Sequence, residues 1–443
     1  MVKDKYMSIA TYFNFKENKT SFKTEIVAGV TSFLAVMYII IVNSKILSLT
    51  GMPFDALVTS TVIISAFASI AMGIYAKNPY VLAPGMGMNA FFTFTIVKLW
   101  DIDWHVALGA VMWSGIIFLL LAIFNIRTKI INAVPKSIQN SLGAGIGLFI
   151  ALVGLKNAGV IISSSETLVR FGAVTPSVLI FLITFLILII LVVRNITGAM
   201  IMSIIIATII ASFFGRLFGS DIIIQTPKHI FSMPDFSLFF QLDLLGALKW
   251  SIVPVILTFL FINIFDSSGT LIGLAHSINW IDEKTGEPKR MRQSLLVDST
   301  ASSLSGLIGV SPATVFVESA SGISVGGRTG IVAITAGVLF LPFMFLSPLI
   351  NMVPLFAVAP ILVTIGCFMM KGVGKINWNN LEDAIPAFLT IMLIPFGFSI
   401  SEGVAWGIVA WYFIKLFQDR NEISWTSSVI TFCCILIIIN NIA

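Results

Sequence analysis

The sequence is poor in charged residues and in cysteine. Only 11% of its 443 residues are charged and 57% are hydrophobic, whereas a water-soluble domain carries about a quarter charged residues. This composition excludes a soluble enzyme, a nucleic-acid-binding domain and a disordered chain. The three cysteines, of which Cys433 and Cys434 are adjacent, lie in apolar stretches without metal-type spacing. Neither a disulfide framework nor a metal site is therefore expected.

Long stretches without charge make up most of the chain. Residues 329–370 contain no charged side chain. Further uncharged runs cover residues 26–44, 56–76, 78–97, 104–126, 137–155, 171–193 and 195–215. Most of these runs reach the roughly 20 apolar residues that cross the hydrocarbon core of a bilayer. The chain is thus predicted to be an all-α polytopic membrane protein. Its polar, Lys-rich first 25 residues do not form a cleavable signal peptide.

Fourteen membrane spans are predicted from the apolar segments. They lie at 26–49, 54–76, 79–97, 104–124, 136–158, 176–194, 197–219, 248–274, 294–310, 312–325, 328–348, 354–371, 384–399 and 402–418. The apolar tail 426–442 is either a further crossing or a helix lying against the bundle. Lys and Arg gather in the N-terminal tail and in loops 125–136 and 281–293, which places these regions in the cytoplasm. We expect a multi-pass plasma (inner) membrane protein with a cytoplasmic N-terminus.

Two of these spans cannot be continuous helices. Span three contains two prolines and two glycines between Pro79 and Gly87, and proline removes a donor and clashes with the preceding turn. Span ten opens with Ser311-Pro312, followed by a Thr-Val-Phe-Val stretch that favours extended backbone. Short extended strands are therefore expected before half-helices in spans three and ten. Their matching places in two halves of seven spans indicate a 7+7 inverted repeat, the signature of secondary transporters.

Two acidic residues lie deep within predicted spans. Asp266 has no charged neighbour for 16 residues before it or 15 after it, and Glu318 has none for 19 before it or nine after it. A carboxylate at the centre of a membrane helix costs about 2.5–3.5 kcal/mol on insertion scales, so such groups usually line a pathway or relay protons. The alternative is an acid hydrogen-bonded to Ser and Thr for packing. Asn263, one turn before Asp266, can face the same cavity, and Asn43 is either a site residue or an interhelical partner.

No set of residues in the sequence resembles a catalytic centre. A P-loop, a nucleophile elbow, a zinc-binding motif and a hydrolase triad are all missing from the sequence, so no enzyme and no cofactor are expected. Phe91 and Phe316, beside the two breaks, could stack on a flat ligand, although most of the phenylalanines are packing surface. The candidate binding residues around the breaks are Met88, Asn89, Ala90, Phe91, Phe316, Val317, Glu318 and Ser319.

Several long motifs resemble the AzgA-type purine permeases. The motifs cover residues 83–92, 265–273, 317–322 and 326–330, with shorter matches at 24–29, 143–149 and 385–390. These permeases are hypoxanthine/guanine and adenine transporters related to the nucleobase–ascorbate (xanthine/uracil permease) group. The resemblance covers nearly the whole chain in order. It is specific for the family and does not select one substrate.

The resemblance implies proton symport of purine bases by alternating access between a core and a gate domain. The implied parts are a cytoplasmic tail (1–25), core segments 26–124 and 248–350, gate segments 125–247 (with an outer loop) and 351–420, and an apolar C-terminal tail (421–443). Glu318 would be the principal purine-binding acid, Asp266 a second essential acid and Asn43 a polar contributor, with the proton coupled through both acids. The family pattern Asp-Leu-Phe-Asp reads Asn263-Ile264-Phe265-Asp266 here. Because asparagine does not titrate, proton stoichiometry or substrate preference can differ.

The expected partners are a purine nucleobase and the lipid bilayer, with no nucleic acid. Hypoxanthine or guanine is expected before adenine, a proton is the only coupling ion, and a homodimer is left open. One alternative is an anion transporter of the same inverted-repeat fold, although a buried acid repels anions. Others are a xanthine/uracil-type nucleobase transporter, and a membrane enzyme or receptor.

Overall fold

The computed structural model describes residues 10–124, 133–164, 166–217, 227, 229–278, 280–281, 288–418 and 423–442. The start of the N-terminal tail and much of the two predicted basic loops lie outside the described residues. Within the described residues, helix occupies each of the fourteen predicted spans. The prediction of an all-α membrane protein is therefore confirmed.

The first half of the chain supplies spans one to seven. Its elements are α2 (Phe22–Val36), α3 (Tyr38–Ser48), α4 (Phe54–Ala71), η1 (Met72–Ala76), β1 (Leu82–Pro84), α5 (Met86–Ala90), η2 (Phe91–Leu99), α6 (Trp104–Ile123), α8 (Lys136–Asn157), β2 (Ile161–Ser164), β3 (Leu168–Phe171), α9 (Pro176–Val193) and α10 (Ala199–Leu217). Here η denotes a short 3-10 or π-helical stretch. Helix starts follow local capping: the Ser21 and Thr175 hydroxyls accept from backbone N–H groups in the first turns of α2 and α9.

The second half supplies spans eight to fourteen and the C-terminal helix. Its elements are η3 (Gly246–Leu248), η4 (Trp250–Ile252), α11 (Val253–Ser277), α12 (Met291–Ile308), β4 (Ala313–Val315), η5 (Val317–Ser319), α13 (Ala320–Ser324), α14 (Gly330–Phe340), η6 (Leu341–Phe345), α15 (Ser347–Asn351), α16 (Leu355–Met369), η7 (Met370–Lys375), α17 (Leu381–Gly397), α18 (Ile400–Gln418) and α19 (Trp425–Ile442). In the described part of the chain, eight helical segments are long and apolar enough to cross a membrane. Spans three and ten are shorter because each begins as a strand.

The two predicted extended pieces pair with each other at the centre of the molecule. Strands β1 and β4 are antiparallel, with Leu82 opposite Val315 and Pro84 opposite Ala313. The Gly85 N–H donates to the Pro312 carbonyl at 2.9 Å, so the pairing continues to the start of α5. All backbone groups within a bilayer need partners, and this pairing supplies them where proline prevents helix. The predicted strand-then-half-helix arrangement of both spans is confirmed.

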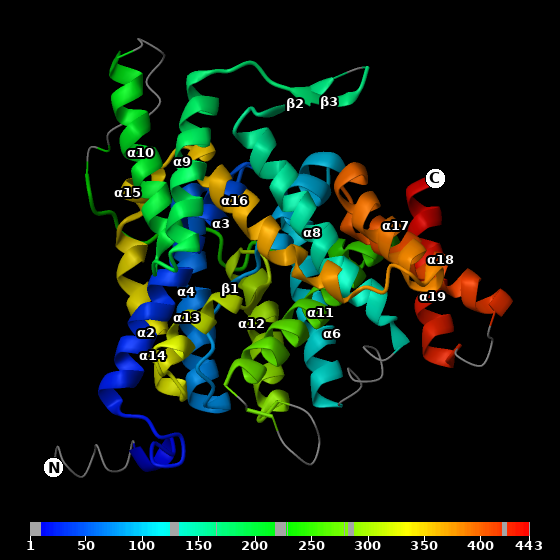
Figure 1. Ribbon diagram of the computed structural model, residues 1–443, viewed down its shortest axis with the longest axis horizontal. Helices are drawn as coiled ribbons and strands as arrows, with labels where there is room; N and C mark the ends of the chain where they lie inside the picture. The colour runs from blue at the N-terminus through cyan, green and yellow to red at the C-terminus, as the bar shows by residue number, and fades with distance from the viewer. Residues whose placement is uncertain are drawn as a thin grey trace.

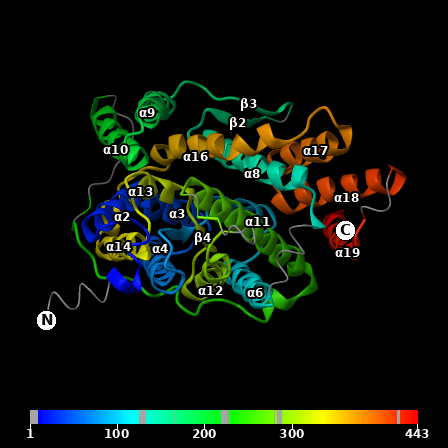
Figure 2. The same cartoon turned by 60° about the horizontal axis from the view of Figure 1, so that its bottom comes forward.

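The helices form two layers, and the strand pair lies within one of them, packed against α4, α11 and α12 (Figures 1 and 2). In Figure 2, α8, α9, α10, α16 and α17 lie along one side, and α2, α3, α4, α6, α12 and α14 lie on the other. Within the first layer α8 packs against α16 and α17, and within the second α12 packs against α6 and α14 against α2. The layers follow the residue ranges expected for gate and core segments, and the division into moving domains stays a prediction.

A buried carboxylate fixes the start of α14 to α2. Glu25 is 0% exposed and its two oxygens accept from the backbone N–H groups of Arg328 and Thr329, both at 3.0 Å, and from the Thr329 hydroxyl at 2.7 Å. The Thr20 hydroxyl donates a further bond at 2.7 Å. Four donors on one carboxylate compensate its burial. Glu25 thus holds the first span to the loop between α13 and α14.

Two features at the periphery go beyond the sequence prediction. The connection between α8 and α9 carries a β-hairpin, in which β2 pairs antiparallel with β3 and Ile161 lies opposite Phe171. The apolar tail, left undecided by the sequence, forms α19, which packs against α18 and lies at the edge of the bundle away from α9 and α10 (Figure 1).

Candidate functional site

Glu318 lies directly after β4, at the start of the broken span. It sits in η5, between the exposed Val317 and the buried Ser319, and its own side chain is half-buried. The Ser319 hydroxyl accepts from the Val81 N–H at 2.9 Å and donates to the Phe316 carbonyl at 2.7 Å. These bonds attach the turn that contains Glu318 to Val81, the residue before β1. The carboxylate itself accepts a 2.8 Å hydrogen bond from the Tyr38 hydroxyl.

Asp266 reaches the same region from the middle of α11. Its side chain is half-buried, and the Thr314 hydroxyl of β4 lies 3.5 Å from Oδ2. The Thr314 hydroxyl is also 3.0 Å from the Ser267 hydroxyl. The β4 strand therefore brings the acid of span eight and the acid of span ten to one place.

Both acids line one cavity of about 350 Å³, which we call the α8–α11 cavity. Its volume lies in the about 300–1,000 Å³ range of small-molecule sites. The walls combine aromatic and aliphatic side chains with a few polar groups, and among the described lining residues Lys371 is the only cation. The lining residues are Gln139, Asn140, Leu142, Gly143, Ile146, Ile262, Phe265, Asp266, Gly269, Thr270, Gly273, Val317, Glu318, Ile365, Phe368, Met369, Lys371 and Gly372.

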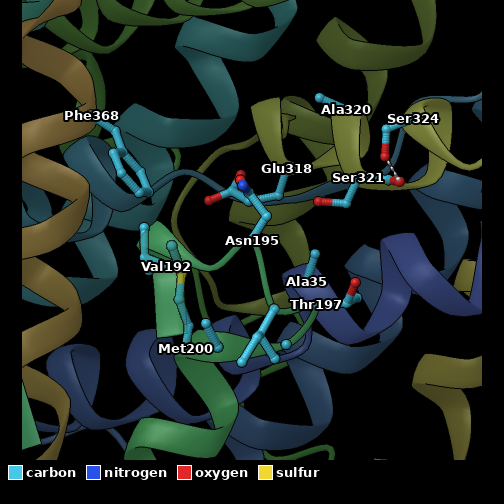
Figure 3. A pocket seen from close by; sticks show the side chains of 13 residues that line it. Ala35, Val192, Asn195, Thr197, Met200, Glu318, Ala320, Ser321, Ser324 and Phe368 are labelled. Carbon is cyan, nitrogen blue, oxygen red and sulfur yellow. Dashed lines mark hydrogen bonds between the residues drawn. The ribbon is translucent and has the colours of Figure 1, made fainter. Parts of the chain in front are cut away.

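A second cavity, the α10–α13 cavity, lies on another side of Glu318 and measures about 340 Å³. It shares only Glu318 and Phe368 with the first cavity. Figure 3 shows its labelled side chains, including Asn195 and Thr197, around the Glu318 carboxylate. The lining residues are Ala35, Val192, Asn195, Ile196, Thr197, Gly198, Ala199, Met200, Glu318, Ala320, Ser321, Ser324 and Phe368.

Both cavities lie toward the end of the molecule where α8 begins, since the α9–α10 connection that lines the α10–α13 cavity follows two spans later, α8 and α9. The α8–α11 cavity follows the first turns of α8, which begins after loop 125–132, and the later turns of α11, which ends before loop 279–287. At the other end of span three, the Thr95 hydroxyl of η2 donates to the Phe398 carbonyl between α17 and α18 at 2.6 Å. The α8–α11 cavity therefore extends toward the end that carries the basic loops, and a hydrogen bond joins span three to the α17–α18 connection at the opposite end.

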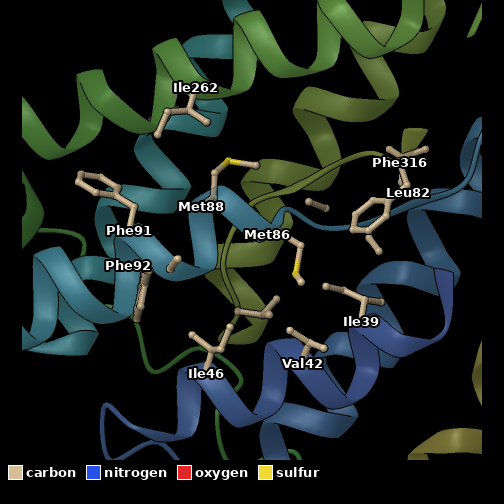
Figure 4. Close-up of a cluster of buried hydrophobic side chains, with 14 of the residues drawn as sticks. Ile39, Val42, Ile46, Leu82, Met86, Met88, Phe91, Phe92, Ile262 and Phe316 are labelled. Atoms are coloured by element: carbon tan, nitrogen blue, oxygen red, sulfur yellow. The ribbon is translucent and has the colours of Figure 1, made fainter. Parts of the chain in front are cut away.

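Three of the predicted site residues, Asp266, Val317 and Glu318, border the α8–α11 cavity. The other candidates line neither cavity in this conformation. Met88, Phe91 and Phe316 lie in a cluster of buried hydrophobic side chains (Figure 4). The remaining candidates are also buried: Asn43, Asn89, Ala90, Asn263 and Ser319.

Asn43 has a clear structural role. Its amide donates to the Thr61 hydroxyl at 2.8 Å, and its carbonyl oxygen accepts from Asn89 and from Ser311, each at 3.2 Å. One side chain thus connects spans one, two and three with the approach to span ten. Of the two roles that the sequence left open for Asn43, these contacts are those of an interhelical hydrogen-bond partner.

Only one of the two half-helix N-termini borders a cavity. Gly87 in the first turn of α5 packs so closely on α8 that a Cβ there would lie 2.7 Å from Ile146 Cγ2. The N-terminus of α5 is therefore covered by α8. The turn after β4, by contrast, contributes Val317 and Glu318 to the cavity wall.

Sequence reasoning missed four residues that contact or neighbour the two acids. Tyr38, Thr314 and Phe368 sit in apolar or strand stretches, where nothing in the local pattern marks them. Asp298 of α12 is fully buried and lies within predicted span nine. The criterion that identified Asp266, an acid inside a span, also applies to Asp298 and could have identified it.

Comparison with known proteins identifies the family of the chain. The permease family matches residues 23–406. The chain is 41% identical over 408 residues to the adenine permease AdeP of Escherichia coli, covering 92% of this chain and 90% of that protein. It is 36% identical over 416 residues to the guanine/hypoxanthine permease PbuO of Bacillus subtilis, covering 92% of this chain and 95% of that protein.

A solved structure supports the fold. The transmembrane domain of a cyanobacterial bicarbonate transporter, BicA, superposes with a TM-score of 0.64 at 16% identity, covering 88% of this chain and 98% of that domain. At this identity the match concerns the fold alone, and it supports the predicted 7+7 inverted repeat. The resemblance to purine permeases found in the motifs is confirmed by the full-length relatives. The chain therefore belongs to the permease family and is a multi-pass membrane transporter with the inverted-repeat fold, not an enzyme.

Proposed function

We propose that this transporter imports purine nucleobases across the plasma membrane by proton symport, with its N-terminus in the cytoplasm. Two relatives that match over nine-tenths of the chain are named for adenine and for guanine/hypoxanthine. Both names concern purine bases, so the proposed substrate class is the purine base. Competition among the three bases will determine which one this chain prefers.

The observation that carries the proposal is the position of Glu318 on the wall of the α8–α11 cavity. A purine base is flat and carries adjacent N–H donors, and a carboxylate can accept two such donors side by side. Phe265 and Phe368 line the same cavity and offer faces for the ring. A carboxylate beside aromatic walls therefore provides both orientation and apolar contact for a planar heterocycle.

Proton coupling follows from the pair of acids. Among the residues lining the α8–α11 cavity, only Asp266, Glu318 and Lys371 are charged groups. Keeping two carboxylates charged within one enclosed space is costly unless each has partners. A proton on one of them lets the other accept the base, so proton and base binding are linked. The membrane potential contributes about 2.3 kcal/mol per charge per 100 mV to inward proton movement.

The cavity geometry corresponds to an inward-facing state in this proposal. The basic loops at the end toward which the α8–α11 cavity extends are the regions that the positive-inside rule places in the cytoplasm. The Thr95–Phe398 hydrogen bond joins span three to the α17–α18 connection at the opposite end. Import would then require the Thr95–Phe398 contact to separate while α8 and α16 close over Glu318 from the cytoplasmic side.

The test is uptake of radiolabelled hypoxanthine, guanine and adenine into cells that lack their own purine carriers. Glu318→Ala should abolish uptake at normal membrane expression, whereas Glu166→Gln, an exposed acid on the β2–β3 hairpin, should transport normally. A protonophore should collapse accumulation by the wild type. Normal purine uptake by Glu318→Ala would refute the role of Glu318. Sodium dependence without protonophore sensitivity would refute the coupling, and bicarbonate or sulfate uptake in place of purine uptake would favour the anion alternative.

A further inference from the structure

The α10–α13 cavity is not needed to hold a base, yet it reaches the same carboxylate. Its polar lining comes from the α9–α10 connection and from α13, with Asn195 and Thr197 on one side and Ser321 and Ser324 on the other. Neither Asp266 nor Phe265 belongs to this cavity. The aromatic wall and the second acid that suit a purine ring are therefore confined to the α8–α11 cavity.

We propose that the α10–α13 cavity is a water-filled proton route between Glu318 and the cytoplasm, separate from the path of the base. The inference rests on the proposed function, because it assigns the two cavities to the two species that a symporter releases. The base leaves through the α8–α11 cavity. The proton leaves Glu318 on the other side, past the α9–α10 connection.

The dimensions and chemistry of the cavity suit ordered water. At about 30 Å³ per molecule of liquid water, a volume of about 340 Å³ has room for about ten. Bridging waters need polar partners, and four hydroxyl or amide side chains line the walls: Asn195, Thr197, Ser321 and Ser324. The Ser324 hydroxyl donates to the Ser321 carbonyl at 2.7 Å (Figure 3), which leaves its own oxygen free to accept from water.

Glu318 is the only charged residue among those that line this cavity. The charged or titratable groups that face it from other elements are Asp266 and Lys371 in the α8–α11 cavity, and Tyr38, which donates to Oε1. After the base has left the Glu318 carboxylate, Glu318 takes up the proton that Asp266 carried in the loaded state. Glu318 then passes this proton to a water in the α10–α13 cavity and is again a carboxylate, while the proton leaves in hydrated form. The next proton arrives from outside after the carrier reorients, so each cycle moves one proton through Glu318.

Phe368 marks the boundary between the two routes. It comes from α16 and lines both cavities, as Glu318 does. An aromatic ring can stack on a base on one side and exclude it from the other. The hydroxyl-lined cavity then stays available to water while the base occupies the α8–α11 cavity.

The decisive variant fills the α10–α13 cavity with apolar side chains. Thr197 and Ser324 are both exposed, so the double variant Thr197→Leu/Ser324→Leu replaces two hydroxyls without removing buried packing. The matched control, Thr197→Ser/Ser324→Thr, keeps both hydroxyls. Each purified protein is placed in liposomes containing a pH-sensitive dye, and two rates are measured. One is exchange of labelled base for unlabelled base, and the other is uphill uptake of base with its proton flux.

Exchange requires the base to leave the site but does not require the proton to leave. We expect the Leu/Leu variant to exchange base like the wild type, while its uphill uptake and proton flux fall by about tenfold or more because a proton-transfer step is impeded. The Ser/Thr control should retain both the exchange of base and the uphill uptake with its proton flux. Equal loss of exchange and uphill uptake would overturn the inference, since the cavity would then be the path of the base. Unchanged rates of both would also overturn it.

The same experiment separates failure of the inference from failure of the proposed function. If wild-type uptake moves no protons at all, the symport proposal itself is refuted. If wild-type uptake is proton-coupled and the Leu/Leu variant retains full coupling, only the second route is refuted. If the proton flux of the Leu/Leu variant falls while its exchange of base persists, the result supports both the symport proposal and the separate proton route.

Discussion

Tyr38 controls how Glu318 is presented to a substrate, and its hydroxyl can be removed with little change in shape. Tyr38 is fully buried at the start of α3, and its hydroxyl donates to Glu318 at 2.8 Å. A hydrogen bond to a charged group contributes about 1.5–3 kcal/mol, and a neutral one about 0.5–1.5 kcal/mol. Because the half-buried Glu318 can recruit cavity water instead, we expect Tyr38→Phe to cost about 1–2 kcal/mol, or about five- to thirtyfold in affinity.

The assay is concentration-dependent uptake of labelled purine together with binding to the purified protein. Tyr38 fixes the orientation of the carboxylate and does not carry the base, so the KM and the Kd should rise together while the maximal rate changes little. Tyr80→Phe is the matched control, because Tyr80 is also buried in the core but lines neither described cavity. Unchanged or tighter binding by Tyr38→Phe would refute the argument that this hydrogen bond pre-orients Glu318.

Two further substitutions separate the framework from the site. Glu25→Ala leaves the buried N–H groups of the α13–α14 loop without their acceptor, so the unfolding free energy should fall by about 3–5 kcal/mol; a melting temperature of the purified protein equal to that of the wild type would contradict this. Gly269 lines the α8–α11 cavity and no atom lies within 4 Å of a Cβ built there, so Gly269→Phe should fold normally but block purine uptake. Gly374→Phe, at another glycine with open space, is its control, and equal uptake by the two variants would show that the base does not occupy this cavity.

The breaks in spans three and ten could be predicted from sequence because they depend on local chemistry. Proline at 84 and 312 cannot donate a backbone hydrogen bond, and in the structure Pro84 ends β1 and Pro312 directly precedes β4. The position of Glu318 after such a break, with no charged neighbour nearby, marked it as a site residue in the same way. Both inferences use only the chain within a few residues and the cost of unpaired polar groups in a membrane.

The remaining contacts of the site depend on how distant helices face one another. Phe368 comes from α16, an apolar helix whose sequence shows no preferred face, and Asn195 comes from the short connection between α9 and α10. Their approach to Glu318 is set by packing between the two layers. Asn89 and Phe91 were predicted to line the site but are buried by the packing of their helices. They follow the break directly, yet the rotation of α5 and η2 buries Asn89 against Asn43 and Phe91 against Phe259.

The most direct test of the central claim is equilibrium binding of radiolabelled purine bases to purified wild-type protein and to Glu318→Gln. Glutamine keeps the size of the side chain but replaces one carboxylate oxygen with an NH₂ group that cannot accept a hydrogen bond. The account predicts that the variant binds the preferred base at least about tenfold more weakly than the wild type, since a charge-assisted pair of hydrogen bonds is lost. Equal affinity of the two proteins would contradict the claim that Glu318 holds the base.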